Sequence, residues 1–241
     1  GAWEASLVNT LNEGDHVLMV ETGHFASLWN KMAMKLGLNT EFIETNWRNG
    51  LDCSEIEKRL KLDVDQKIKA VCIVHNETST GCKSDVWAVR QVLDNLKHDA
   101  LLMVDTISGL ASINYEHDNW GVDVTISGSQ KGLMLPPGLS FNAISNKALI
   151  ASKNSKMKRS YWDWDECLEF NKSGFFPYTP ATNMLFGLKE AIAMLHEEGL
   201  ENVFKRHARY SKATRIAVQS WGLEVFCKNK DRFSDVLTAV I

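Results

Sequence analysis

The chain has 241 residues, of which 44% are hydrophobic and 24% are charged, and this composition is typical of a globular protein with a sizeable core. Its 27 basic and 30 acidic residues give a net charge of -3, which argues against a nucleic-acid or membrane-surface partner, since both need a basic surplus. No apolar run approaches the roughly 20 residues of a membrane span, and the five cysteines are odd in number and widely spaced. We therefore expect a cytoplasmic protein without disulfides.

Short apolar runs alternate with stretches of helical period over more than half of the chain, which predicts an α/β fold with a mostly parallel sheet. Two predicted strands, Val122–Ser127 and Leu139–Ile144, follow each other too closely for a helix between them, so we expect this pair to be antiparallel. The other elements predicted in this part of the chain are helices at Ala2–Leu11, Ala26–Leu36, Ser54–Leu60 and Val86–Leu96, and strands at Val17–Val20, Glu41–Glu44, Ala70–Val74 and Leu101–Val104.

The remainder of the chain is less regular. Residues 147–180 are first basic, then aromatic and acidic, then rich in glycine and proline, and we predict a long irregular connection there. Helices are predicted at Asn183–His196 and from Glu201 to Trp221, and strands at Leu223–Phe226 and Val236–Val240.

Polar turns follow three of the predicted strands. Asp105 directly follows one strand, the run from His75 to Gly81 follows a second, and Lys131 lies in a small-residue turn after a third. Because ligands bind at the carboxyl ends of strands in open α/β sheets, we expect these turns to converge. A lysine amine and a carboxylate there suit pyridoxal phosphate, since the amine forms a Schiff base with the aldehyde and the carboxylate keeps the ring nitrogen protonated. Taken singly, Lys131 also fits a solvated loop, and Asp105 a helix cap or a buried ion pair.

The residues in and around these turns resemble class V aminotransferases of the alanine–glyoxylate and serine–glyoxylate group. The resemblance is carried by Val104–Ser108, Gly121–Asp123, Ser127–Lys131 and Pro136–Gly138, and it continues in family order over essentially the whole chain. It implies a pyridoxal phosphate enzyme of fold type I, with a large domain built on a mostly parallel seven-stranded sheet flanked by helices. We accordingly expect the large domain over residues 1–200, and a linking helix with the start of a small C-terminal α/β domain over residues 201–241.

The same resemblance implies a role for the residues nearest the cofactor ring. Lys131 matches the lysine that holds the cofactor and moves the proton of the substrate α-carbon, and Asp105 matches the partner of the pyridinium nitrogen. Ile107 matches the branched aliphatic residue under one face of the ring. Phe25 matches the aromatic residue that stacks on the other face, where alanine–glyoxylate enzymes usually have Trp.

Further positions match contacts at the periphery of the cofactor. Thr78 matches the hydroxyl residue near the ring oxygen O3′, Asn76 is a second candidate donor there, and Gln130 matches a phosphate ligand. Thr179 matches a residue that reaches into the phosphate site of the neighbouring subunit, which implies a homodimer. Phe176 stands where alanine–glyoxylate enzymes place a Tyr for the same purpose, so that second contact is not implied here.

The implied activity is the transfer of an amino group from a small amino acid to glyoxylate or a similar 2-oxo acid by ping-pong chemistry. Serine is the preferred donor, because Gly1–Glu4 and Phe176–Pro180 look more like serine–glyoxylate enzymes, and alanine and aspartate remain open. A lyase of the cysteine desulfurase type and a non-catalytic binding module are the alternatives from other classes. Gly81–Ser84 only resembles the end of a P-loop, and no histidines have metal-ligand spacing, so neither nucleotide nor metal binding is indicated.

The resemblance also implies that the chain is a segment of a longer enzyme. The phosphate-binding turn would precede Gly1, and the rest of the small domain would follow Ile241. That domain normally supplies the arginine that binds the substrate carboxylate in bidentate fashion. We therefore expect most of a cofactor site here, but an incomplete substrate site.

Overall fold

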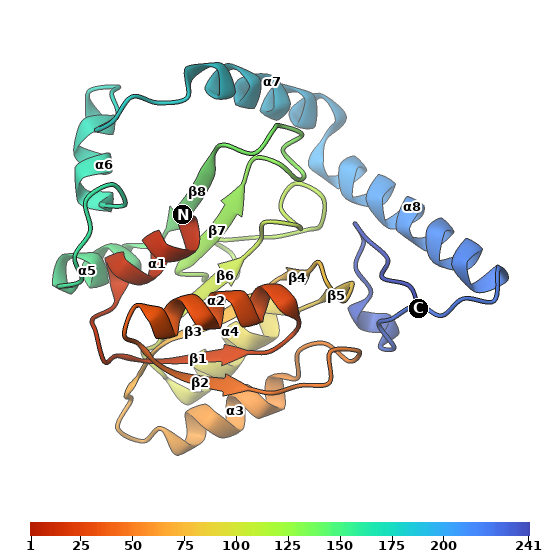
Figure 1. Ribbon diagram of the computed structural model, residues 1–241, viewed down its shortest axis with the longest axis horizontal. Helices are drawn as coiled ribbons and strands as arrows, with labels where there is room; N and C mark the ends of the chain where they lie inside the picture. Colours follow the sequence, from red (N-terminus) through yellow and green to blue (C-terminus); the bar gives the residue numbers. More distant parts are fainter.

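The structure is a computed structural model that describes residues 1–241, and it is built on a mostly parallel sheet (Figure 1). The strands are β1 (His16–Val20), β2 (Asn39–Ile43), β3 (Ile68–Val74), β6 (Leu101–Asp105), β7 (Val124–Gly128) and β8 (Ser140–Ile144). Their order is β2-β1-β3-β6-β7-β8, and only the β7–β8 pair is antiparallel, which confirms the α/β prediction and the expected antiparallel pair. The sheet has six strands rather than the seven that the resemblance implied.

Helices cover both faces of this sheet. The helices are α1 (Ala2–Thr10), α2 (His24–Lys35), α3 (Cys53–Leu62), α4 (Val86–Leu96), α5 (Asn146–Asn154), α6 (Trp164–Lys172), α7 (Thr182–Glu198) and α8 (Leu200–Ser220). Met103 of β6 packs with residues of α1 and α2 in one buried cluster, whereas its neighbour Leu102 packs with residues of α3 and α4 in another. Successive residues of a strand point to opposite faces, so β6 is buried on both sides, as its continuous apolar run predicts.

The predicted irregular connection over residues 147–180 is wrong in part, because it contains α5 and α6. Each of these short helices begins at a side-chain cap: the Ser145 hydroxyl accepts a hydrogen bond from the backbone N–H of Ala148 (3.1 Å), and Asp163 accepts from those of Asp165 (2.9 Å) and Glu166 (3.2 Å). The polar composition that suggested a loop therefore includes one helix cap, Asp163, and the other cap, Ser145, lies just before this stretch.

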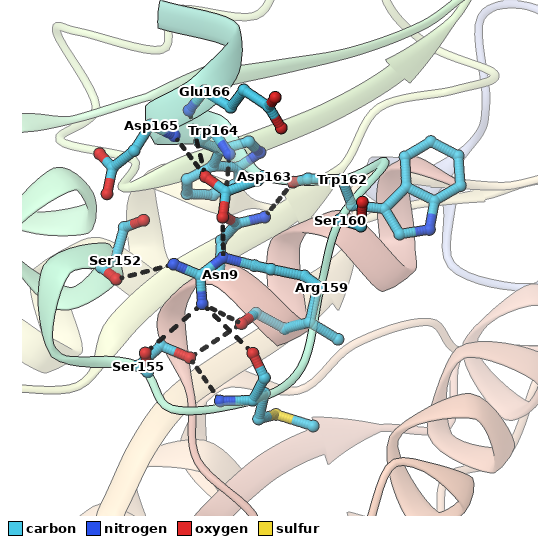
Figure 2. A network of polar contacts seen from close by, with 12 residues as sticks. Asn9, Ser152, Ser155, Arg159, Ser160, Trp162, Asp163, Trp164, Asp165 and Glu166 are labelled. Carbon is cyan, nitrogen blue, oxygen red and sulfur yellow. Dashed lines mark hydrogen bonds and ion pairs between the residues drawn. The ribbon is translucent and has the colours of Figure 1, made fainter. Parts of the chain in front are cut away.

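The segment between α5 and α6 is held against α1 by a polar network (Figure 2). The side-chain amide of Asn9, fully buried in α1, donates to the carbonyl of Trp162 (2.6 Å), and its carbonyl accepts from the backbone N–H of Trp164 (3.1 Å). Arg159 pairs with the capping carboxylate of Asp163 (3.3 Å) and donates to the carbonyl of Ser152 (3.2 Å). These contacts fix the position at which α6 starts.

The C-terminal residues also differ from expectation. The predicted strands at Leu223–Phe226 and Val236–Val240 are wrong as regular elements, because the two segments share only one isolated bridge, between Val225 and Val240, with backbone hydrogen bonds on either side of it. The segment from 222 to 241 instead packs back on the sheet domain. Ser234 donates its N–H to the carbonyl of Gly81 (2.9 Å) in the turn between the two-residue strands β4 (Asn76–Glu77) and β5 (Cys82–Lys83). No helix in the chain combines the length and the apolar character needed to cross a membrane.

We predict that Asn9→Ala destabilises the protein by about 2 to 3 kcal/mol, because it leaves buried backbone groups of the segment before α6 without partners. The free energy of unfolding, measured by urea denaturation, is expected to fall by that amount. Asn154→Ala, which removes an exposed amide at the end of α5, is the matched control and should change the value by less than about 0.5 kcal/mol. Equal effects of the two substitutions would contradict the role of Asn9.

Candidate functional site

Three polar turns meet at one edge of the sheet, as predicted from the sequence. Strands β3, β6 and β7 are adjacent and parallel, so their carboxyl ends lie side by side. Backbone hydrogen bonds tie the turns to these ends: His75 N–H donates to the carbonyl of Asp105 (2.8 Å), and Thr106 N–H donates to the carbonyl of Ile126 (2.8 Å). The edge therefore places Asp105, the turn after β3 and the turn after β7 in one region.

Asp105 is a buried carboxylate, with 4% of its surface exposed. One of its oxygens accepts a hydrogen bond from the backbone N–H of Ile107 (2.7 Å), and the other accepts from the indole N–H of Trp3 (2.6 Å). Burial raises the pKa of Asp105 to about 6, although both hydrogen bonds act in the opposite direction. Trp3 is in turn stacked on Trp29, with the two ring centroids 5.9 Å apart, so the indole donor is held in place by the core.

Lys131 lies on a turn that leaves little freedom to the backbone. The buried hydroxyl of Ser129 donates to the carbonyl of Pro136 (2.8 Å) and accepts from the N–H of Leu139 (3.2 Å), which closes the loop between β7 and β8. At Gly132 a Cβ atom would lie 2.1 Å from the carbonyl oxygen of Leu110, so only glycine fits this approach. The turn is thereby pressed against the turn after β6, and the exposed side chain of Lys131 projects from it.

A cavity of about 390 Å³ surrounds this lysine. On the sheet side it is lined by Lys131, Thr78 and Ser108, which come from three different turns. The opposite wall comes from the later part of the chain: Leu195, Val203, Arg206, His207, Val236 and Leu237. Arg206 is already bound in bidentate fashion to Glu198, at 2.6 and 2.8 Å. The cavity thus combines an amine and hydroxyls on one wall with a largely apolar wall opposite.

Asn76 and Ser108 form a buried link beside the cavity. The Ser108 hydroxyl donates to the backbone carbonyl of Asn76 (2.6 Å) and accepts from its side-chain amide (3.1 Å). The side-chain carbonyl oxygen of Asn76 is buried without a hydrogen-bond partner. Buried polar atoms are normally paired, so this oxygen is one that a bound molecule could satisfy.

Not every residue singled out from the sequence lines the cavity. Phe25 (36% exposed) is at the start of α2, and Gln130 is exposed beside Lys131. Ile107 is half-buried and packs against the core. Thr179 and Phe176 are exposed in the connection between α6 and α7, which runs along the periphery of the molecule (Figure 1). The cavity itself brings together only Thr78 and Lys131 of the predicted residues, with Asp105 and Asn76 adjacent.

Two buried contacts of the site were not predicted. Trp3 was noted only as part of the resemblance, and its hydrogen bond to Asp105 spans 102 positions of the sequence. Glu77 stands in the polar turn that was singled out, yet only the structure shows that it binds the first turn of α2. No group of three or more His, Cys, Asp or Glu side chains is placed to hold a metal ion.

Comparison with known proteins gives a consistent result. The family model described as "Aminotransferase class-V" matches residues 3–240. The chain is 44% identical to the serine–glyoxylate aminotransferase of Arabidopsis thaliana, in an alignment that covers all of this chain and 60% of the relative. It is 41% identical to the L-aspartate–glyoxylate aminotransferase of Paracoccus denitrificans, over all of this chain and 61% of that relative. The chain therefore spans about three fifths of the length of these relatives.

Solved structures give the same fold. The alanine–glyoxylate aminotransferase from Nostoc sp. superposes with a TM-score of 0.92 at 27% sequence identity, over 99% of this chain and 63% of that one. The pyridoxamine–pyruvate aminotransferase from Mesorhizobium loti superposes with a TM-score of 0.91 at 26% identity, over 99% of this chain and 60% of that one.

We predict that Asp105 makes the stability of the ligand-free protein depend on pH. Its pKa in the folded state is about 6, above the ordinary 3.8, so the folded state binds more protons between these values and its stability falls as pH rises through 6. Between pH 5 and pH 8 the contribution of Asp105 to the free energy of unfolding should fall by about 1 to 2 kcal/mol.

Asp105→Asn removes this titration. Between pH 5 and pH 8 the free energy of unfolding of the wild type, measured by urea denaturation, should therefore fall by about 1 to 2 kcal/mol more than that of the variant. Asp118→Asn, at an exposed position, is the control and should follow the wild type at both pH values. A constant difference between Asp105→Asn and the wild type would contradict the shifted pKa.

Proposed function

Because the chain belongs to the class-V aminotransferase family, we propose that it forms the greater part of a pyridoxal phosphate-dependent aminotransferase. The proposed reaction moves an amino group from a small amino acid, with serine as the preferred donor, to glyoxylate or a similar 2-oxo acid. The observation that carries this proposal is the placement of Lys131 and Asp105 at the carboxyl ends of two adjacent parallel strands, β7 and β6.

The residues present fit this cofactor. A buried carboxylate suits a protonated ring nitrogen, an exposed lysine at the cavity suits an aldehyde, and the unpartnered oxygen of Asn76 offers an unused polar contact. We assign Thr78 and Asn76 to the ring hydroxyl, Gln130 to the phosphate, and Phe25 and Ile107 to the two faces of the ring. These assignments are supported by their positions around the same sheet edge.

Pyridoxal phosphate, when bound, supplies an electron sink for the electron pair left at the substrate α-carbon. Within this scheme Lys131 holds the cofactor and then uses the free Nζ atom to remove and return the proton of the α-carbon. Asp105 keeps a proton at the ring nitrogen. Val203, Val236 and Leu237 add apolar surface to the cavity wall opposite Lys131.

The donor is the least constrained part of the proposal. Relatives named for serine and for aspartate have similar identities to this chain, 44% and 41%, so overall similarity favours serine only weakly. A lyase of the cysteine desulfurase type remains the rival activity. It needs a reactive cysteine near the substrate, and none of the five cysteines lines the cavity with Lys131, which favours the transaminase.

We also propose a division of the chain near residue 200. Gly199, at φ 79°, separates α7 from α8, a conformation that glycine adopts readily. In this division residues 1–200 hold the cofactor, and residues 201–241 form the linking helix and the start of a smaller domain.

A homodimer is the proposed assembly. The connection between α6 and α7 exposes several aromatic side chains, and contiguous exposed apolar residues mark interaction surfaces. In this assembly Thr179 reaches the phosphate site of the second subunit, while Phe176 offers no hydroxyl for that contact. The exposed aromatic residues of the connection are Phe175, Phe176 and Tyr178, and Phe170 of α6 and Phe186 of α7 are exposed beside it in the chain.

The activity is tested with pyridoxal phosphate and separate donors. We expect the full-length wild-type protein to show the visible absorption band of protein-bound cofactor, to lose it fastest on addition of serine, and to lose it more slowly with alanine or aspartate. Lys131→Ala should abolish the band, because the amine that holds the cofactor is gone. Lys153→Ala, at an exposed position of α5, should leave both the band and its response unchanged.

Two results would contradict the proposal. Absence of the band in the wild type would exclude the cofactor, and release of sulfide from cysteine without amino transfer would favour the lyase.

The contribution of Thr179 is tested by mixing subunits. Thr179→Ala should weaken cofactor binding about tenfold, the loss of roughly one charged hydrogen bond, when measured by titration of the absorption band. Co-expressing Thr179→Ala with Lys131→Ala should restore wild-type affinity to a fraction of the sites, because the mixed dimer unites an intact Lys131 with an intact Thr179. No restoration would mean that Thr179 does not act across subunits.

A further inference from the structure

Glu77 is a buried carboxylate that the proposed chemistry does not use. Only 1% of its surface is exposed, and its partners are N–H and O–H donors rather than a basic side chain. One carboxylate oxygen accepts from the backbone N–H groups of Phe25 (3.3 Å) and Ser79 (3.1 Å) and from the Ser79 hydroxyl (2.7 Å). The other oxygen accepts from the N–H of Ala26 (3.2 Å). A charge is costly to bury, so this arrangement needs all of its donors.

Two of the donors, the N–H groups of Phe25 and Ala26, belong to the first turn of α2, where helix N–H groups have no partner within the helix. The positive end of the helix dipole points in the same direction, which further stabilises a carboxylate there. Glu77 therefore does for α2 what a capping residue does, although it is more than 50 positions away in the sequence.

The turn that contains Glu77 and Ser79 packs tightly against the start of α2. A Cβ atom at Gly23 would lie 2.5 Å from both the Cγ atom of Glu77 and the hydroxyl oxygen of Ser79. His24 also donates its N–H to the Ser79 hydroxyl (2.9 Å). The start of α2 is thus fixed relative to Glu77 by direct packing and by hydrogen bonds to successive backbone groups.

Two residues assigned to the cofactor flank this contact. Phe25 is itself a donor to Glu77, and Thr78 is the next residue in the chain. The negative charge of Glu77 also acts on the carboxyl of Asp105 and contributes to its raised pKa. A negative potential of this kind favours a proton on a ring nitrogen held by Asp105.

We propose that Glu77 is a positioning residue, which sets Phe25 against one face of the cofactor ring by binding the first turn of α2. This inference rests on the proposed cofactor and goes beyond it, because Glu77 acts through Phe25 and not by contact with the ring. Without Glu77, the first turn of α2 loses its acceptor and the Phe25 side chain loses its fixed distance from Thr78.

The test is a double-mutant cycle on cofactor affinity with Glu77→Gln and Phe25→Ala in the pyridoxal phosphate-loaded protein. Glu77→Gln keeps the shape of the side chain, but its amide nitrogen cannot accept a hydrogen bond. We expect the dissociation constant of the cofactor to rise about tenfold in Glu77→Gln, but less than about threefold when Phe25 is already Ala, because residues that act through one another are not additive. Circular dichroism of the visible band should weaken in Glu77→Gln, since it reports the asymmetric placement of the ring.

Controls separate this role from general damage. Glu57→Gln, in a surface ion pair of α3, should leave affinity and circular dichroism unchanged. Ser79→Ala removes one donor to Glu77 and the acceptor of His24, so it provides a milder variant for the same cycle if Glu77→Gln does not fold. Additive effects in the cycle, or unchanged circular dichroism, would overturn the role of Glu77 alone. Absence of the band in the wild type would overturn the proposed function together with it.

Discussion

Two buried carboxylates without cationic partners determine how this site is built. Asp105 and Glu77 are 4% and 1% exposed, and each is stabilised by N–H donors rather than by lysine or arginine. Such donors compensate a buried charge only at short distance and in good geometry. The two carboxylates can therefore be buried only when the helices and turns that supply these donors are correctly packed. This requirement makes the site a consequence of tertiary packing and not of any single loop.

The donors come from the first 26 residues and from the turns themselves. Trp3 of α1 binds Asp105, and the start of α2 binds Glu77, although the two carboxylates lie much later in the chain. Both helices cover the same face of the sheet, and Trp3 is stacked on Trp29 within that layer. The helical layer therefore has two roles: it buries apolar surface, and it supplies hydrogen-bond donors to the carboxylates at the carboxyl ends of β3 and β6. A substitution in this layer would affect the site without touching it.

The sequence predicted those parts of the fold that depend on local pattern. The helix Val86–Leu96 was predicted at its observed bounds, and the β7–β8 pair was expected to be antiparallel because too few residues separate the two strands. The same reasoning failed over residues 147–180, which contain α6 and nearly all of α5, helices capped by Asp163 and Ser145. Their sequences are polar and the helices short, so the periodic signal is weak, and the caps are visible only once the helices are known.

The residues of the candidate site likewise fall into those that the sequence could predict and those that it could not. Lys131 and Asp105 could be predicted, because a polar residue at the end of an apolar strand is a local signal. The partners Trp3 and Glu77 could not, because a tryptophan in a buried helix and a glutamate in a polar turn are common, and only distant contacts distinguish them. The predicted strands at the C-terminus failed for a related reason, since two of their apolar residues, Val236 and Leu237, line the Lys131 cavity and do not form a regular strand.

The two walls of the cavity differ in the residues that they offer to a cofactor or a substrate under the proposed function. The wall formed by Lys131, Thr78 and Ser108 faces the cofactor, and that chemistry is the same for every amino donor. The opposite wall includes Arg206 and His207 of α8. Arg206 is held by both oxygens of Glu198, so a carboxylate entering the cavity would compete with Glu198 for the guanidinium.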